Sequence, residues 1–353
     1  MRFLTVLVVC TCYCLLAIVD VHNDLTPFIF TENKGFLPMP ESETNPVSVE
    51  GAELGRYLFY DPILSADSTI SCSSCHRQEY AFSDGGKRFS NGVNGTTTAR
   101  NAPALFNLAW NKRLFWDGEA GSIEEQVLFP VRDHAEMNLS WTDAERRLNR
   151  SEFYKKRFLE VFGIRYIDSL SIAKAIGQFE RTLISANSKL DQVARLENKL
   201  NEQEIRGMVV MNYQDLGDCL HCHVTEAHLM GTNYKFSNNG IENITRLEDY
   251  PDKGLGGITG NPKEMGLFKI PSLRNVAVTG PYMHDGRFGT LGQVIGFYSD
   301  SLHPSPNIDP KMTKVHEGGA HLSPGDQEAV IKFLHCLTDS AFITNPAFGN
   351  PFK

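Results

Sequence analysis

The chain has 353 residues, of which 41% are hydrophobic and 22% charged, and a formal net charge of -8 at neutral pH. This composition is typical of a globular protein and excludes a largely disordered chain. The acidic balance, without a long basic run, argues against a nucleic acid as partner. A chain of this length favours about two domains.

The first 22 residues carry the pattern of an export signal. One arginine precedes an apolar run over residues 3–19, and polar residues follow. The run is borderline in length for a membrane-spanning helix, and no clear small-residue cleavage site follows it. The segment is therefore either a cleaved signal peptide or an N-terminal membrane anchor. Cys10, Cys12 and Cys14 lie within it, but the residues before each cysteine lack the small side chains typical of a lipidation site.

The first chemical motif is Cys72-Ser-Ser-Cys75-His76. Two thiols at this spacing can each form a thioether with one vinyl group of a single haem, and the adjacent histidine then binds the iron. A loop rich in Gly, Asn and Thr follows, over residues 83–101. The motif predicts a covalently bound haem c.

The middle of the chain is predicted to be helical. Thr142-Asp-Ala-Glu145 has the pattern of a capping box that opens a helix toward Phe162. Apolar residues at helical spacing predict an amphipathic helix from Leu170 to about Ala186. The charged stretch over residues 189–206 is interpreted as a domain junction or a solvated helix.

The second chemical motif, Cys219-Leu-His-Cys222-His223, lies 147 residues after the first. Zinc or a redox CxxC pair is the alternative, since His221 and His228 could supply further ligands. Two copies of the same pattern in one exported chain favour two haem c groups, one in each domain.

The last part of the chain is expected to combine long loops with one more helix. Residues 231–265 are rich in Gly, Asn and Pro and are interpreted as loop, whereas Ser323-Pro324 has the pattern of a helix start. Cys336 is expected to be a small buried hydrophobic side chain. Because strand-like alternation is scarce, the fold class expected is mainly α, with two cytochrome c-like haem domains and long loops.

The order of several motifs resembles one known family. CSSCH, RNAPALFN, FWDGEAGSIEEQ, CLHCH, FKIPSLRN and GPYMHDG occur in the order found in bacterial di-haem cytochrome c peroxidases, a family that includes MauG. The resemblance covers roughly residues 35–345. It implies an N-terminal peroxidatic haem domain (35–190), which binds hydrogen peroxide, and a C-terminal electron-relay haem domain (200–345).

The resemblance also implies partners and a location. Electrons would come from a small periplasmic donor, a cytochrome c or a cupredoxin, and the protein would be an exported peroxidase of the periplasm. Family peroxidases are often homodimers, so a homodimer is a further expectation. The alternative within the family is a MauG-like oxidase that acts on a partner protein or a small aromatic substrate, and outside it an electron-transfer or sensing cytochrome without catalysis.

Site residues follow from matches to the family motifs. Gln126, Pro130 and Glu136 match the distal pocket of the peroxidatic haem, where a base moves a proton between the two peroxide oxygens. Trp116 matches the tryptophan between the haems. For either Glu136 or Trp116, a surface or core role is the alternative interpretation.

A calcium ion at the domain boundary is also implied. Asn101, Thr279 and Pro281 match its ligands in the family, and oxygen-rich coordination suits calcium. The alternative is that these three are ordinary turn residues.

The chain departs from the peroxidase pattern at both haems. No histidine lies between His76 and His134, so the sixth position of the first iron is expected to be open or to hold water. Tyr298 stands where peroxidases usually place a methionine ligand to the relay haem, as in MauG, with Met283, Met312 or His303 as alternatives. Gly217 replaces the surface tryptophan of MauG, so the MauG substrate is not implied.

Overall fold

The computed structural model describes residues 25–33, 35–225 and 230–353. The expected export segment, its three cysteines and His228 lie outside these residues. The described chain is mainly helical, as predicted, with one two-stranded antiparallel sheet formed by β1 (Phe236–Ser237) and β2 (Phe268–Lys269). Over the described ranges, no helix has the length and apolar character needed to cross a membrane.

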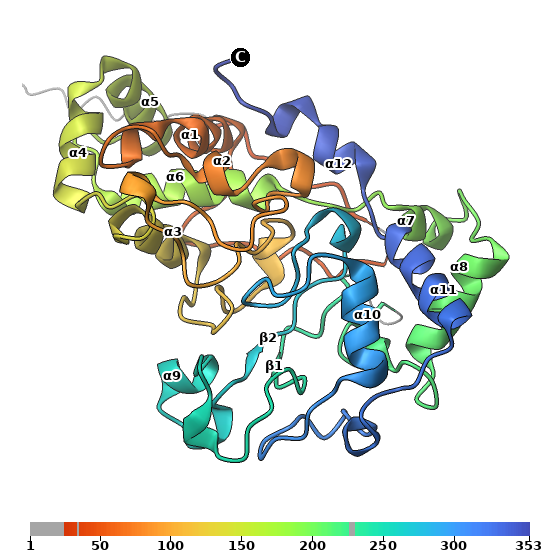
Figure 1. Cartoon of the computed structure of the whole chain (residues 1–353). Coiled ribbons are helices and arrows are strands. Elements are labelled where there is room, and N and C mark those ends of the chain that lie inside the picture. Colours follow the sequence, from red (N-terminus) through yellow and green to blue (C-terminus); the bar gives the residue numbers. More distant parts are fainter. Residues whose placement is uncertain (1–24, 34, 226–229) are drawn as a thin grey trace, which may run out of the picture.

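The first half of the chain packs its helices around one buried core (Figure 1). Its fully buried aromatic side chains include Phe59, Phe82, Phe158 and Phe179. The helices are α1 (Val49–Tyr60), α2 (Cys72–Cys75), α3 (Ile123–Arg132), α4 (Trp141–Arg150), α5 (Glu152–Phe162) and α6 (Ser169–Thr182).

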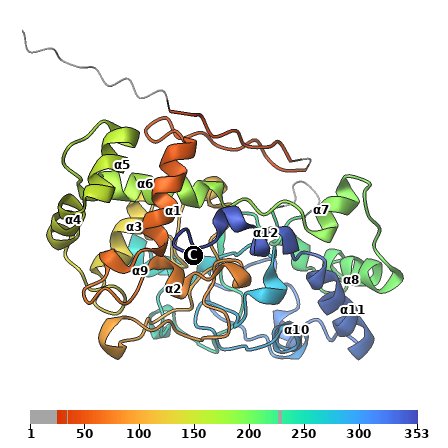
Figure 2. The same ribbon diagram turned by 90° about the horizontal axis from the view of Figure 1, so that it is seen from above.

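The second half builds smaller buried clusters, centred on residues such as Val210 and Phe333. Its helices are α7 (Lys189–Ala194), α8 (Glu202–Asn212), α9 (Leu255–Thr259), α10 (Leu291–Asp300), α11 (Pro324–His335) and α12 (Ser340–Thr344). The last of them, α12, returns to the first half (Figures 1 and 2), where the Phe342 ring packs against that of Phe82 at 5.7 Å between centroids. The end of the chain therefore ties the two halves together.

The same helix crossing occurs in both halves. In α1, a Cβ built on Gly55 would lie 1.9 Å from the carbonyl oxygen of Ala175 in α6, and in α8, one built on Gly207 would lie 2.1 Å from that of Ala329 in α11. Only glycine permits such an approach of two backbones. Each crossing joins the helix that precedes a CxxCH motif to the last long helix of its half, so the two halves repeat one structural plan.

Two helix predictions were wrong at their ends. The capping residue of α4 is Ser140, whose hydroxyl accepts from Asp143 N, and a break at Ser151 divides the predicted helix into α4 and α5. The Glu145 carboxylate instead accepts from Ser169 N at the start of α6, a contact across 24 residues. The helix α6 ends at Thr182, four residues before the expected end.

The expectation that residues 231–265 are loop was wrong in part, because β1 and α9 lie within them. Two other expectations for the second half agree with the structure. Ser323 caps α11, with Pro324 in its first turn, and Cys336 is buried at the end of that helix. The charged stretch over residues 189–206 divides between α7, a connecting loop and the start of α8.

Candidate active site at the two CxxCH motifs

The first CxxCH motif forms the short helix α2, with His76 at its end. The Nδ1 atom of His76 lies 2.8 Å from the Phe82 carbonyl oxygen, which leaves Nε2 for a metal. Burial lowers the pKa of His76, so the imidazole is in the neutral form that binds iron. Cys72 and Cys75 form no disulfide, so both sulfurs are available to form thioethers.

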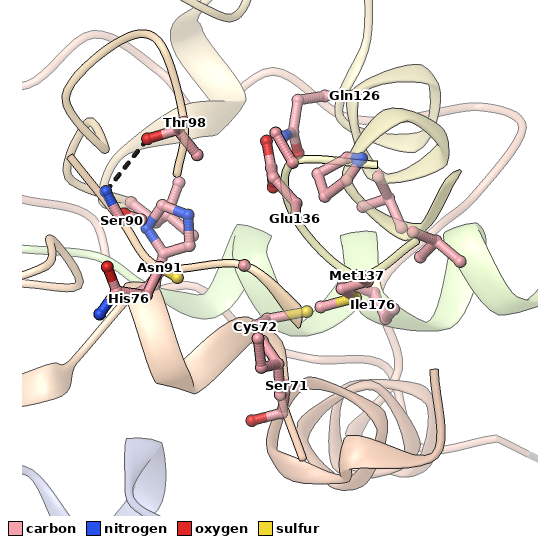
Figure 3. Close-up of a pocket in the computed structure, with 18 of the residues that line it drawn as sticks. Ser71, Cys72, His76, Ser90, Asn91, Thr98, Gln126, Glu136, Met137 and Ile176 are labelled. Carbon is pink, nitrogen blue, oxygen red and sulfur yellow. Dashed lines mark hydrogen bonds between the residues drawn. The ribbon is translucent and has the colours of Figure 1, made fainter. Parts of the chain in front are cut away.

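A cavity with about 620 Å³ of empty space adjoins this motif, part of it open to solvent. Its walls include Cys72, His76, Gln126, Pro130 and Glu136. Figure 3 shows Gln126 and Glu136 together at one end of the cavity and Cys72 toward the other. The structure therefore brings the three residues expected in a distal pocket together with the expected haem-binding residues.

Glu136 is held in place by a tight turn after α3. Met137 N donates to the Pro130 carbonyl oxygen and Asn138 N to that of Asp133, while the Glu136 carbonyl oxygen accepts from Val93 N. Burial, with a smaller contribution from the Asp133 carboxylate, raises the pKa of Glu136 to about 7. A carboxyl group with this pKa can accept or donate a proton at neutral pH.

The loop over residues 89–100 packs directly against this turn. Ser90 N donates to Thr98 Oγ1 at 3.0 Å (Figure 3), and a Cβ built on Gly92 would lie 2.0 Å from the Ala135 carbonyl oxygen. Ser90, Gly92 and Thr98 all line the cavity. This loop contains no histidine, so it contributes only glycine and small polar side chains to the cavity wall.

One polar atom shows that the polypeptide alone does not complete the cavity. Glu180 Oε2 is buried and makes no hydrogen bond with any described residue. Burial raises the pKa of Glu180 to about 8, although the Arg181 guanidinium beside it acts in the opposite direction. Two cysteines without a disulfide, a neutral histidine and a cavity beside them fit a covalently bound haem, so the residues present match the group that the motif implies.

The second CxxCH motif has the same proximal arrangement. His223 Nδ1 lies 2.9 Å from the Pro271 carbonyl oxygen, and burial lowers the pKa of His223. Cys219, Cys222 and His223 line a second cavity with about 2220 Å³ of empty space, part of it open to solvent. These residues also fit a covalently bound haem.

Zinc is the alternative considered for this motif, with His221 and His228 as further ligands. Over residues 25–33, 35–225 and 230–353, no group of three or more His, Cys, Asp or Glu side chains is arranged to hold a metal ion. His221 instead lies 3.2 Å from the Asp218 carboxylate, and His228 is outside the described residues.

Tyr298 on α10 reaches the second cavity, and so does Met283. Burial raises the pKa of Tyr298 to about 12, while a hydrogen bond from Asn239 lowers it. The Asn239 amide nitrogen lies 2.9 Å from the Tyr298 hydroxyl oxygen and 3.6 Å from the Met283 sulfur. Met312 also lines the cavity, whereas His303 does not.

Trp116 lines the second cavity from the first half of the chain. Its indole Nε1 donates to the Asn101 carbonyl oxygen at 2.8 Å, and its own carbonyl oxygen accepts from Lys269 N on β2. Trp116 is thus fixed at the contact between the two halves, with a hydrogen bond to each.

The three residues expected to bind calcium line this same cavity. Asn101 is buried, and its side-chain nitrogen donates to the Lys87 and Arg88 carbonyl oxygens. Asn101 N donates to the His284 carbonyl oxygen, which links it to the loop that carries Thr279 and Pro281. The donor set contains the oxygens that calcium prefers.

Three polar residues of the sites were not singled out from the sequence. Glu180 lies within the amphipathic helix α6, Asn239 lies in a loop, and Lys269 is on the short strand β2. Burial lowers the pKa of Lys269 to about 8, although Asp117 acts in the opposite direction. Lys269 lies within the motif FKIPSLRN, but no motif marks Glu180 or Asn239, because each becomes a site residue only through packing.

Comparison with known proteins identifies relatives along most of the chain. Residues 49–199 match the model of a family described as di-haem cytochrome c peroxidase. The methylamine utilization protein MauG of Methylophilus methylotrophus is 32% identical over 308 residues, which cover 86% of this chain and 87% of that protein. The cytochrome c551 peroxidase of Nitrosomonas europaea is 34% identical over 262 residues, 72% of this chain and 75% of that protein.

A solved structure agrees in fold over nearly the whole length. A MauG-like protein associated with microbial copper homeostasis has a TM-score of 0.84 and 32% identity, and the match covers 92% of this chain and 100% of that chain.

Proposed function

Because the chain belongs to the di-haem cytochrome c peroxidase family, which includes MauG, we propose that it reduces hydrogen peroxide to water with electrons from a small periplasmic donor such as a cytochrome c or a cupredoxin. The reaction consumes one peroxide, two electrons and two protons and yields two waters. The observation that carries the proposal is Glu136, whose pKa is raised to about 7 in the cavity of the first CxxCH motif.

The chain's own groups perform the proton chemistry. Bound haem supplies the iron at which the peroxide O–O bond is cleaved and the electrons that reduce it. Glu136 accepts a proton from the near peroxide oxygen and returns it to the far oxygen, which then leaves as water. Gln126, beside it in the cavity, orients the peroxide by hydrogen bonding, and Pro130 fixes the turn that carries Glu136.

The first cavity is ready to accept peroxide without prior reduction. The loop over residues 89–100 carries no histidine, and Gly92 and Val93 already contact the turn of Glu136. Since no ligand has to leave and no loop has to move, the diferric protein is active as isolated.

The C-terminal domain, residues 200–345, supplies electrons to the peroxidatic domain, residues 35–190. Trp116 stands at the contact between them, hydrogen-bonded to Asn101 and Lys269. An indole at this position divides one long electron-transfer distance into two shorter ones. Asn101, Thr279 and Pro281 would hold a calcium ion, which would stabilise the same contact.

One observation favours a second candidate function, a MauG-like oxidation of a partner protein or a small aromatic substrate. Tyr298 lines the second cavity, and an anionic oxygen ligand stabilises oxidised iron more than a thioether does. Gly217 gives no surface tryptophan beside the second motif, so methylamine dehydrogenase is not proposed as the substrate.

The test is an absorbance and electron paramagnetic resonance survey of the diferric protein, with and without hydrogen peroxide. The proposal predicts one high-spin haem, two haems per chain and a rapid spectral response to peroxide. Two low-spin haems that ignore peroxide would refute both the peroxidase and the oxidase and leave an electron-transfer cytochrome.

A further inference from the structure

Asn239 lies in the second cavity and is used by neither proposed function. Its side-chain nitrogen donates a hydrogen bond of 2.9 Å to the Tyr298 hydroxyl oxygen and a second, longer one of 3.6 Å to the Met283 sulfur. An amide N–H donates well to a phenol oxygen, whereas a thioether sulfur is a weak acceptor. Of the two candidate ligands that Asn239 contacts, Tyr298 therefore accepts the stronger hydrogen bond.

The segment around Asn239 is anchored on both sides. The neighbouring Asn238 side chain is buried, and its nitrogen donates to Tyr250, Ser305 and Asn307 while its oxygen accepts from Gly240 N. This network fixes the backbone from which the Asn239 amide extends.

The next residue, Gly240, packs against His303 and holds the segment from the other side. It has a φ of 73°, and a Cβ there would lie 2.9 Å from the His303 carbonyl oxygen. The Gly240 carbonyl oxygen accepts from His303 N. The Asn239 amide is thus held toward Tyr298 by contacts within the chain, as expected of a residue that supports a ligand.

We propose that Asn239 is a positioning residue that raises the reduction potential of the relay haem by donating a hydrogen bond to the oxygen through which Tyr298 binds the iron. This inference rests on the proposed ligation by Tyr298. A donor on an anionic ligand withdraws electron density from it, so the oxygen stabilises ferric iron less. Asn239 thereby partly offsets the low potential that an oxygen ligand imposes and keeps the relay haem reducible by a mild periplasmic donor.

The experiment compares Asn239→Leu with wild type in the holoprotein, by redox titration against a reference dye and by absorption. Leucine has a similar size but no donor. We expect two haems per chain, a lower relay potential, equivalent to about a tenfold change in the equilibrium with the dye, and a tyrosinate-to-iron charge-transfer band at lower energy. Asn261→Leu removes an exposed asparagine that caps Pro262–Glu264, and should match wild type.

A double-mutant cycle separates this role from a general effect on folding. In a Tyr298→Phe background, Asn239→Leu should no longer change the potential, because the oxygen that it contacts is gone. If Asn239→Leu fails to bind both haems, Asn239→Ala removes the same donor with less bulk and is measured in the same way.

Failure of the inference and failure of the ligand assignment give different results. If Tyr298→Phe alone leaves the relay potential and spectrum unchanged, Tyr298 is not a ligand and the inference falls with that assignment. If Tyr298→Phe changes both but the Asn239 variants match wild type, or raise the potential, only the role of Asn239 is overturned.

Discussion

Replacing Glu136 with glutamine tests the proton chemistry at the first CxxCH motif. The substitution keeps the shape of the side chain and a hydrogen-bonding group, but removes the proton acceptor. General acid–base groups contribute about 10²–10⁴-fold in rate, which corresponds to about 3–5 kcal/mol of activation free energy. We expect the second-order rate constant with peroxide to fall by this factor, with both haems still bound.

The pH dependence follows from the pKa of about 7. Below it Glu136 is protonated and cannot accept a proton, so the wild-type rate constant falls about tenfold per pH unit, and above it the rate constant reaches a plateau. In Glu136→Gln the rate constant should no longer fall as the pH drops below this pKa. In Asp133→Asn the midpoint should move to lower pH, because Asp133 raises the pKa of Glu136, but only slightly, because burial is the larger cause.

The assay is stopped-flow mixing of the diferric protein with peroxide across the pH range from about 5 to 9, in excess peroxide. Glu152→Gln, which changes an exposed carboxylate of the same half, is the matched control and should behave as wild type. If Glu136→Gln keeps both the wild-type rate constant and its fall at low pH, Glu136 is not part of the mechanism.

Three further predictions concern the relay and the fold. Tyr298→Met should raise the relay potential in a redox titration; an unchanged potential would show that Tyr298 is not a ligand. Trp116→Phe should slow donor turnover about tenfold or more while the first reaction with peroxide keeps its rate, because the indole lies between the two halves; equal slowing of both steps would contradict this. Gly55→Ala should lower the free energy of unfolding by about 1–3 kcal/mol in denaturant titration, since its Cβ would meet Ala175. Gly325→Ala, with open space around its Cβ, is its control and should be neutral.

The haem sites could be read from the sequence because their chemistry is local. Two thiols and a histidine within five residues form one binding unit in whatever fold carries them. The mainly helical fold followed from hydrophobic spacing for the same reason, since each helix face is visible within one segment.

What could not be read depends on contacts between distant segments. The predicted cap at Thr142 was wrong because the Glu145 carboxylate accepts a hydrogen bond from Ser169 N instead. This contact exists only when α4 and α6 pack together. The crossings at Gly55 and Gly207 repeat in space but share no obvious sequence pattern. In the sequence, Glu180 and Asn239 look like ordinary helix and loop residues. Only in the folded chain does Glu180 line the first cavity and Asn239 the second.

The most direct test of the proposed function is stopped-flow mixing of the as-isolated diferric protein with hydrogen peroxide, in the presence of a reduced cytochrome c. Because the first cavity is preformed and its loop offers no histidine, we predict immediate oxidation of the donor, two equivalents for each peroxide, without prior reduction of the protein. A lag that only pre-reduction removes would contradict the preformed site, and peroxide consumption without donor oxidation would contradict the peroxidase assignment and favour the oxidase.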